Sequence, residues 1–180
     1  MCDHGDHECS HTTTAASVHQ TLDELDFERG IWAAARDGEA GRVRSLLDRG
    51  TAANAQDSSG YTALHYASRN GHLEVCDLLL QRGANPNSQT RSGGVTPLHR
   101  AAYCGHEAVV KLLLKKRADP SLCDEDGKNA LHKSAERGHV QVSRLLLQAA
   151  PDTRNVQDKR GKTPINYVPR DCQEMLSLLS

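Results

Sequence analysis

Apolar and polar positions follow the same order several times along the chain. Between residues 60 and 87, a short segment with small apolar residues ends at Gly71, and a second segment with three consecutive leucines ends at Gly83. A wide apolar stripe is typical of a helix packed on one face. Glycine ends helices well because it adopts a left-handed conformation at little cost. The pattern therefore predicts two short helices joined by a tight turn.

This helix pair recurs with a period of 33 or 34 residues. Leu64, Leu98, Leu131 and Ile165 are separated by 34, 33 and 34 residues, and Ile31 lies 33 before Leu64. The same register is kept by four glycines and by four pairs of leucines, which are Gly38, Gly71, Gly105 and Gly138, and Leu46–Leu47, Leu79–Leu80, Leu113–Leu114 and Leu146–Leu147. Such a period indicates stacked repeats. The spacings of 34 predict single-residue insertions within residues 92–95 and 149–157.

Turn and capping residues define the ends of each repeat. Residues 57–60 begin with Asp and end with Gly, as type I turns do. The predicted first helices are capped by threonine or asparagine, at Thr62, Thr96, Asn129 and Thr163. In the first copy, Thr21 and Glu24 have the spacing of a capping box, so the domain is expected to begin near residue 21, with a second helix over residues 39–48.

The helix starts TALH, TPLH and NALH, within a period of 33 residues, resemble the ankyrin-repeat family. The resemblance implies an all-α solenoid of helix-turn-helix units with short turn or hairpin connections and a capping repeat at each end. The domain is expected at residues 21–180, with repeats at about 26–56, 57–89, 90–123 and 124–157 and a truncated cap at 158–180. Arg117 and Ala150 replace the glycine found at Gly83, which argues against an unstrained left-handed helix end there.

The resemblance also implies roles for recurring residues. His65, His99 and His132 are expected to hydrogen-bond neighbouring backbone. A metal or nucleophile role for pairs such as His72 and Cys76 is disfavoured, because a residue that recurs in register has a packing explanation. Asn87 resembles asparagines that are hydroxylated in some ankyrin proteins, with turn capping as the alternative.

The composition and charge of the chain limit the classes of partner and the cellular locations that are expected. The net charge of −1 and pI near 6.8 argue against a nucleic-acid partner. No apolar run approaches the roughly 20 residues that span a membrane, and no secretory signal is apparent. An intracellular location, in the cytoplasm, the nucleus or both, is expected, with the cysteines as thiols or metal ligands.

The first twenty residues differ from the rest in composition. They contain Cys2, His4, His7, Cys9 and His11, more ligands than the four that tetrahedral zinc requires. Residues 1–20 are expected to be a disordered Cys/His-rich tail. The alternatives are zinc binding by Cys2, Cys9 and two of the histidines and, if Met1 is removed, a square-planar Cu(II) or Ni(II) site at the amino terminus. No other cofactor is expected.

The leading functional hypothesis is a non-enzymatic scaffold or adaptor, expected to be monomeric, that binds another protein through a concave groove. Tyr61 and Tyr103 are the expected aromatic anchors. Transferring the family's groove positions to this sequence predicts partner-binding residues at Tyr61, Arg69, Asn70, Arg91, Val95, Tyr103, Lys128, Glu136 and Arg137. The alternative hypothesis is a metal-responsive adaptor in which the Cys/His tail is a zinc sensor.

Overall fold

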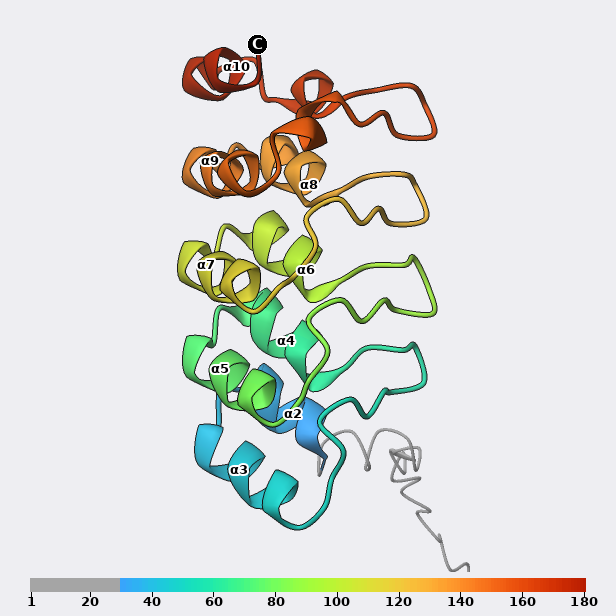
Figure 1. Cartoon of the computed structure of the whole chain (residues 1–180), viewed down its shortest axis with the longest axis vertical. Coiled ribbons are helices and arrows are strands. Elements are labelled where there is room, and N and C mark those ends of the chain that lie inside the picture. The colour runs from blue at the N-terminus through green and yellow to red at the C-terminus, as the bar shows by residue number, and fades with distance from the viewer. Residues whose placement is uncertain (1–29) are drawn as a thin grey trace, which may run out of the picture.

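The computed structural model describes residues 30–180 as a stack of antiparallel helix pairs, arranged in the order of the sequence (Figure 1). The α-helices are α2 (Ile31–Arg36), α3 (Ala40–Asp48), α4 (Ala63–Asn70), α5 (Leu73–Gln81), α6 (Pro97–Cys104), α7 (Glu107–Lys115), α8 (Ala130–Glu136), α9 (Val140–Ala149) and α10 (Gln173–Leu179). Two 3-10 helices, η1 (Pro151–Asn155) and η2 (Pro164–Tyr167), complete the last units. The predicted all-α repeat fold is confirmed. The capping box at Thr21 and the boundary near residue 21 lie outside the described residues.

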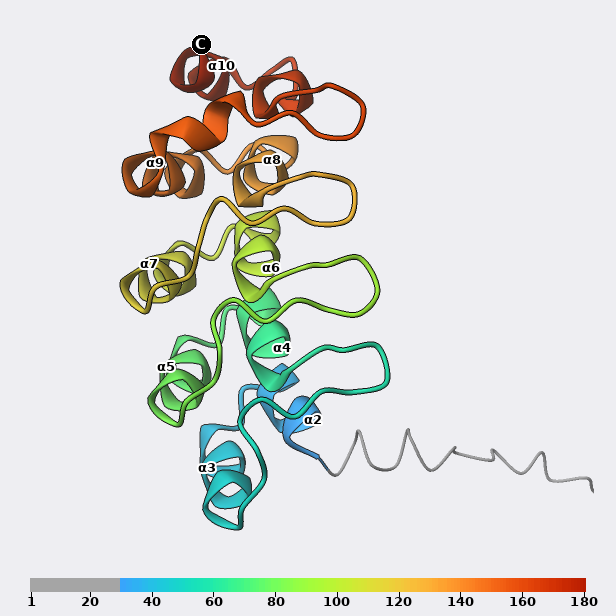
Figure 2. The same ribbon diagram turned by 45° about the vertical axis from the view of Figure 1, so that its right-hand side comes forward.

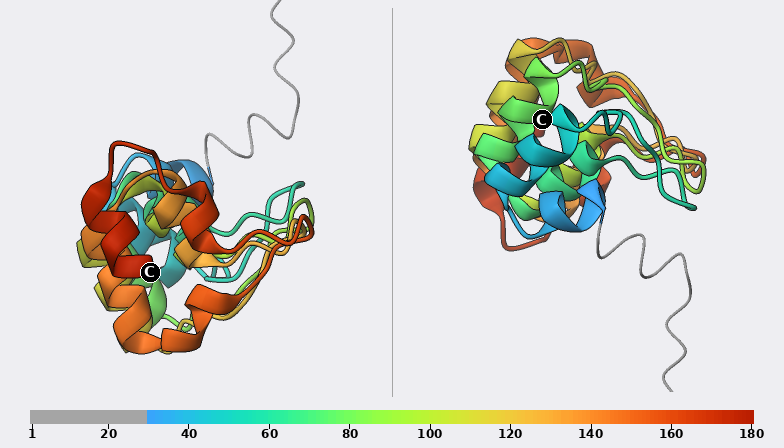
Figure 3. Two further views of the ribbon diagram at one scale, coloured as in Figure 1. Left: turned by 90° about the horizontal axis from the view of Figure 1, so that it is seen from above. Right: turned by 90° about the horizontal axis from the view of Figure 1, so that it is seen from below.

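The first helix of each pair lies on one side of the stack and the second helix on the other (Figure 2). The segments that connect successive pairs project away from the helices on the side of the first helices. Seen along the stack, these connections all point in the same direction (Figure 3). We call them fingers, and they comprise residues 51–62, 84–96, 118–129 and 156–163.

Local sequence determines where the helices begin and end. Thr96 accepts a hydrogen bond from the His99 amide at the start of α6, and Asn129 does the same for His132 in α8. Gly71 and Gly105 end α4 and α6 with φ of 75° and 78°. Arg117 keeps a left-handed conformation, with φ of 67°, at the position of Gly83. In this conformation Cβ lies too close to a backbone carbonyl oxygen, so the strain expected at this helix end is present.

At Ala150 the chain takes a different course. Its φ of −150° is extended, and the 3-10 helix η1 follows directly at Pro151. Helix α9 has 10 residues where α5 and α7 have 9. The insertion predicted within residues 149–157 is therefore accommodated by a longer helix and an additional helical turn.

The core is built from the same positions in every repeat. Leu64, Leu98 and Leu131 of the first helices are at most 1% exposed, and Leu79 and Leu113 of the second helices are fully buried. Alanines that are completely inaccessible to solvent let the first helices approach one another closely; they are Ala67, Ala101, Ala102 and Ala135. At the start of the stack, α3 buries only Val43, as expected of a capping repeat.

The fingers are joined by backbone hydrogen bonds. The amide of Arg91 donates to the Ser59 carbonyl oxygen at 3.2 Å. The amide of Glu125 donates to the Gly93 carbonyl oxygen at 2.9 Å, and that of Lys159 to the Asp126 carbonyl oxygen at 2.9 Å. Each finger therefore fixes the position of the next.

The second finger, residues 84–96, is one residue longer than its neighbours. The turn closes between Thr90 and Val95, whereas the turns before and after it close between residues 57 and 61 and between residues 124 and 128. The extra residue lies at consecutive left-handed glycines, Gly93 and Gly94. The insertion predicted within residues 92–95 is confirmed.

Candidate functional site

The first helices and the adjoining sides of the fingers form one continuous surface, which we call the inner face (Figures 1 and 2). Two sets of histidines hydrogen-bond the backbone of neighbouring repeats and thereby hold this face in place. His65 Nε2 lies 2.9 Å from the Val95 carbonyl oxygen, and His99 Nε2 lies 2.9 Å from that of Lys128. In each histidine, Nδ1 accepts the backbone amide of the helix-capping threonine. Nε2 therefore carries the proton and donates a hydrogen bond to the carbonyl oxygen.

Burial keeps these rings neutral. His65 and His99 are 1% and 2% exposed, and burial lowers the pKa of each to about 4. His132 occupies the same position, and burial lowers its pKa as well. The predicted structural role of the three histidines is confirmed.

The second set of histidines connects each repeat to the one before it. Nε2 of His72, His106 and His139 lies 2.8, 2.9 and 3.0 Å from a carbonyl oxygen at the end of the preceding first helix. Cys76 is buried, and burial raises the pKa of its thiol to about 12, which disfavours the thiolate. Within residues 30–180, no group of three or more side chains is placed to hold a metal ion. His72 and Cys76 therefore have packing roles.

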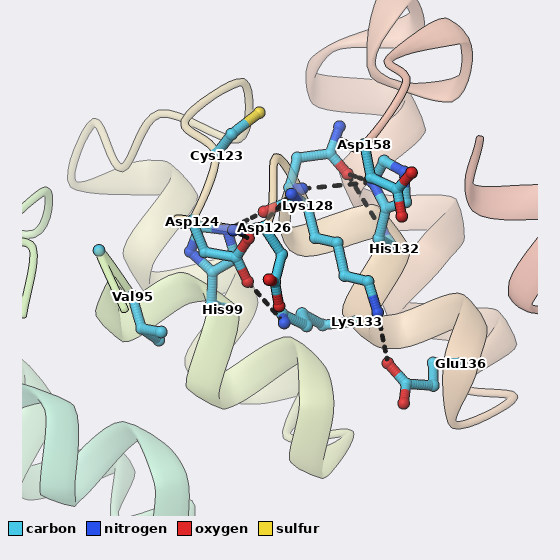
Figure 4. Close-up of polar contacts among 12 residues, drawn as sticks. Val95, His99, Cys123, Asp124, Asp126, Lys128, His132, Lys133, Glu136 and Asp158 are labelled. Carbon is cyan, nitrogen blue, oxygen red and sulfur yellow. Dashed lines mark hydrogen bonds and ion pairs between the residues drawn. The ribbon is translucent and has the colours of Figure 1, made fainter. Parts of the chain in front are cut away.

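A carboxylate closes the turn of the third finger, residues 118–129 (Figure 4). Asp124 Oδ1 accepts the amides of Asp126 and Lys128 at 3.0 and 2.9 Å, and Oδ2 accepts Lys133 Nζ at 2.6 Å. Burial alone would raise the pKa of Asp124. The hydrogen bond and charge of Lys133 outweigh that effect and hold the pKa below its usual value. This finger is therefore attached to α8 by a buried ion pair.

The same arrangement occurs in two other repeats. Asp57 accepts the Tyr66 hydroxyl at 2.6 Å, and Asp158 accepts the Tyr167 hydroxyl, which lowers the pKa of Asp158 to about 2. In each case the aspartate opens the finger turn, and its partner lies nine residues later in the first helix. This pairing was not predicted from the sequence.

The third repeat lacks this aspartate. Thr90 stands where the other repeats have aspartate, and its hydroxyl closes the turn by accepting the Val95 amide at 3.0 Å and donating to the Ser92 carbonyl at 2.9 Å. The equivalent helix position is Arg100, which lies ten residues after Thr90 because this finger is one residue longer. This cation therefore has no carboxylate on its own finger. Arg100 was not predicted as a functional residue. The available sequence signal was the replacement of the recurring aspartate by Thr90.

Arg100 turns toward the preceding repeat instead. Its Nη2 donates to the Tyr61 hydroxyl, and its guanidinium carbon lies 5.1 Å from the centre of the Tyr61 ring. Its Nε is shielded from solvent and has no hydrogen-bond partner. The tyrosine hydroxyl is the one hydrogen-bond acceptor that the guanidinium has among residues 30–180.

Beside Arg100 lies a small pocket of about 110 Å³. It is lined by Val95, His99, Arg100, Tyr103 and Lys133. Tyr103 is 38% exposed, which is unusual for a large aromatic residue of this chain, and the Arg137 guanidinium lies 5.2 Å from the centre of its ring. The pocket thus combines an aromatic wall with cationic side chains.

The predicted groove residues occupy different parts of the inner face. Val95 and Tyr103 line the pocket, with Arg137 over Tyr103 and Tyr61 under Arg100. Lys128 lies 3.7 Å from Glu136 (Figure 4). Its ammonium lies 4.0 Å from the centre of the Tyr167 ring.

Other predicted groove residues lie at the edges of this face. Asn70 donates to the Arg36 carbonyl at 3.0 Å, so its side chain joins two repeats. The exposed Arg69 precedes it at the end of α4, and the exposed Arg91 lies on the second finger. The predicted metal ligands Cys2, His4, His7, Cys9 and His11 lie outside the described residues.

Asn87 also has a structural role. Its Nδ2 donates to the Arg117 carbonyl at 3.2 Å, and its Oδ1 accepts the Asp119 amide at 2.8 Å. These contacts hold the following loop, as expected for turn capping. Hydroxylation of Asn87 stays a prediction.

None of the helices within residues 30–180 combines the length and the apolar character that a membrane-crossing segment needs.

Comparison with known proteins supports the repeat assignment. The family model for ankyrin repeats in three copies matches residues 13–90, 31–124 and 98–180. Human ankyrin repeat domain-containing protein 39 is 55% identical over 82 residues, which are 46% of this chain and 45% of that protein. Its bovine counterpart is 61% identical over 64 residues, or 36% and 35% of the two chains.

A more distant relative is the mouse 2-5A-dependent ribonuclease, which is 35% identical over 82 residues, or 45% of this chain and 11% of that protein. The matched segments span less than half the length of each of these three relatives. The family match covers every repeat that the structure describes, from the capped helix starts to the linked fingers. The chain belongs to the ankyrin-repeat family.

Proposed function

We propose that this chain is a non-enzymatic scaffold or adaptor that binds another protein through its inner face. Ankyrin-repeat proteins generally mediate protein–protein interactions. The observation that carries the proposal is the row of alternating tyrosines and arginines on the inner face. Tyr61 contacts Arg100, and Tyr103 contacts Arg137. Tyrosine and arginine are the residue types most often found at energetically dominant positions of interfaces.

Replacing both tyrosines, as Tyr61→Ala with Tyr103→Ala, should weaken the capture of partner proteins from cell extracts by at least about tenfold, a typical loss at such positions. Captured proteins are quantified by mass spectrometry against the wild-type chain. Tyr61 packs against His65 and Tyr66, with ring centres 5.5 and 5.6 Å apart, so a melting curve must accompany the measurement.

Two further variants make the result interpretable. Tyr103→Ala alone removes the more exposed ring and should leave the melting temperature within a few degrees. Leu73→Ala truncates a large apolar side chain that is 44% exposed on α5, outside the inner face, and should leave capture unchanged. Equal capture by the Leu73 and tyrosine variants would show that the inner face is not the binding surface.

A metal-responsive adaptor is the second candidate, favoured by the five cysteine and histidine residues within the first eleven positions. The full chain should bind zinc, in competition with a chromogenic chelator, more tightly than a Cys2→Ser, Cys9→Ser variant. Loss of both thiolates removes half of a four-ligand site. Equal zinc affinity of the two chains would eliminate the sensor hypothesis. The proposal also includes an intracellular location and a monomeric state, the second of which sedimentation can test.

A further inference from the structure

Within residues 30–180, Arg100 is a cation without a carboxylate partner. In the neighbouring repeats, an aspartate on the finger faces the equivalent helix position, and its Oδ2 accepts a hydrogen bond from Tyr66, Lys133 or Tyr167. In the third repeat this aspartate is Thr90. We propose that the pocket beside Arg100 binds an aspartate or glutamate side chain from an acidic segment of the protein partner. This inference rests on the proposed function and specifies the chemistry of its ligand.

The charges around the pocket favour an acidic ligand. Lys133 is already paired with Asp124, and Lys128 with Glu136. Within the described part of the chain, by contrast, four arginines of the inner face lack an ion-pair partner, namely Arg69, Arg91, Arg100 and Arg137. The inner face of the central repeats therefore presents unpaired positive side chains although the whole chain has a net charge of −1.

Acidic side chains near the pocket do not neutralise Arg100. Glu125 and Asp126 lie on the third finger, and both are exposed to solvent, where water and salt screen their charges. Arg100 is partly enclosed between Tyr61 and the pocket, so its charge is less screened. An incoming carboxylate would meet guanidinium N–H groups that make no other hydrogen bond within residues 30–180.

A carboxylate fits better than a phosphate. Among the residues that line the pocket, Arg100 carries the one positive charge without an ion-pair partner, because Lys133 is paired with Asp124. A phosphate monoester, by contrast, carries up to two negative charges. The repeats themselves show that a carboxylate oxygen fits between a finger and this helix position. The exposed Tyr103 ring would cover the methylene groups of the ligand side chain, and Arg137 lies beside it.

The test measures binding of a fluorescein-labelled hexaglutamate peptide by anisotropy, with hexaglutamine as the uncharged comparison. Hexaglutamate should bind and hexaglutamine should not. Arg100→Gln should weaken hexaglutamate binding about tenfold, in line with the loss of a charge-assisted hydrogen bond. Thr90→Asp should weaken it similarly while keeping Arg100, because the new carboxylate would occupy the place that the peptide uses.

The matched control is Lys115→Gln, which removes the same charge from an exposed position at the end of α7 and should change the affinity less than twofold. A nuclear magnetic resonance titration should also shift the Arg100 Nε–Hε signal, which the Arg100→Gln variant identifies. Melting curves of Thr90→Asp and Arg100→Gln confirm that both variants are folded.

Several results would overturn the inference: no binding of hexaglutamate, an equal loss in Lys115→Gln and Arg100→Gln, or tighter binding of a phosphoserine peptide or a single-stranded RNA. Failure of this inference is distinguishable from failure of the proposed function. If hexaglutamate does not bind but partner capture still depends on Tyr103, the inner face is the binding surface and only the acidic ligand is wrong.

Discussion

Lowering the pH from 7 to about 4 should remove several kcal/mol of the free energy of unfolding, because two buried histidines must become charged. The pKa of His65 and of His99 is about 4 in the folded protein. In the unfolded chain it is near 6.5. Between these values the unfolded chain binds more protons than the folded one, so stability falls as pH falls. The stabilisation is fully present above pH 6.5 and is lost progressively toward pH 4.

The size of this effect follows from the shift. Each pKa unit corresponds to about 1.4 kcal/mol, so each histidine contributes up to about 3 kcal/mol. A domain of this size has a total stability of about 5–15 kcal/mol, so the two histidines account for a large share. Urea denaturation followed by circular dichroism at a series of pH values between 7 and 5 measures the slope before most carboxylates titrate.

The chain itself suggests the control. In the last repeat, Asn166 occupies the histidine position, and its Oδ1 accepts the Thr163 amide at 2.9 Å. His99→Asn should therefore keep the helix cap, lose the bond to the Lys128 carbonyl, and be less stable at pH 7 with a shallower pH dependence. A slope identical to that of the wild-type chain would show that His99 does not titrate on unfolding.

Sequence analysis identified the features that recur in every repeat. The period located the paired helices, and the capping threonines located the starts of the first helices, as Thr62 before α4 and Thr96 before α6 show. The roles of His65 and His99 also followed, because each repeat contains the same residue in the same surroundings. Recurrence is what made these features predictable.

Features that depend on contacts between different repeat positions were missed. Arg100 is important because position 90 lacks a carboxylate, and no property of either residue alone indicates that the two positions face each other. In the same way, Asn70 was assigned to partner binding, whereas its side chain also joins two repeats through the Arg36 carbonyl. Only the three-dimensional arrangement shows which neighbours a side chain has.

Gly105→Ala should cost about 2–5 kcal/mol of the free energy of unfolding, although it adds a single methyl group. Two effects contribute. Gly105 has φ of +78°, a left-handed conformation that costs an alanine about 1–2 kcal/mol. A Cβ there would also lie 2.6 Å from the His139 ring, and such overpacking costs about 1–3 kcal/mol. The ring cannot move away freely because Nε2 lies 3.0 Å from the Tyr103 carbonyl oxygen.

Gly83→Ala separates the two contributions. Gly83 has φ of +85°, but a Cβ there would meet nothing within 4 Å, so only the backbone cost of about 1–2 kcal/mol applies. In a His139→Ala background, Gly105→Ala should cost only the backbone part, since the clash disappears together with the ring. If urea denaturation gives equal losses for Gly105→Ala and Gly83→Ala, the histidine ring does not constrain the glycine, and the close approach of successive repeats at this position is not what selects glycine there.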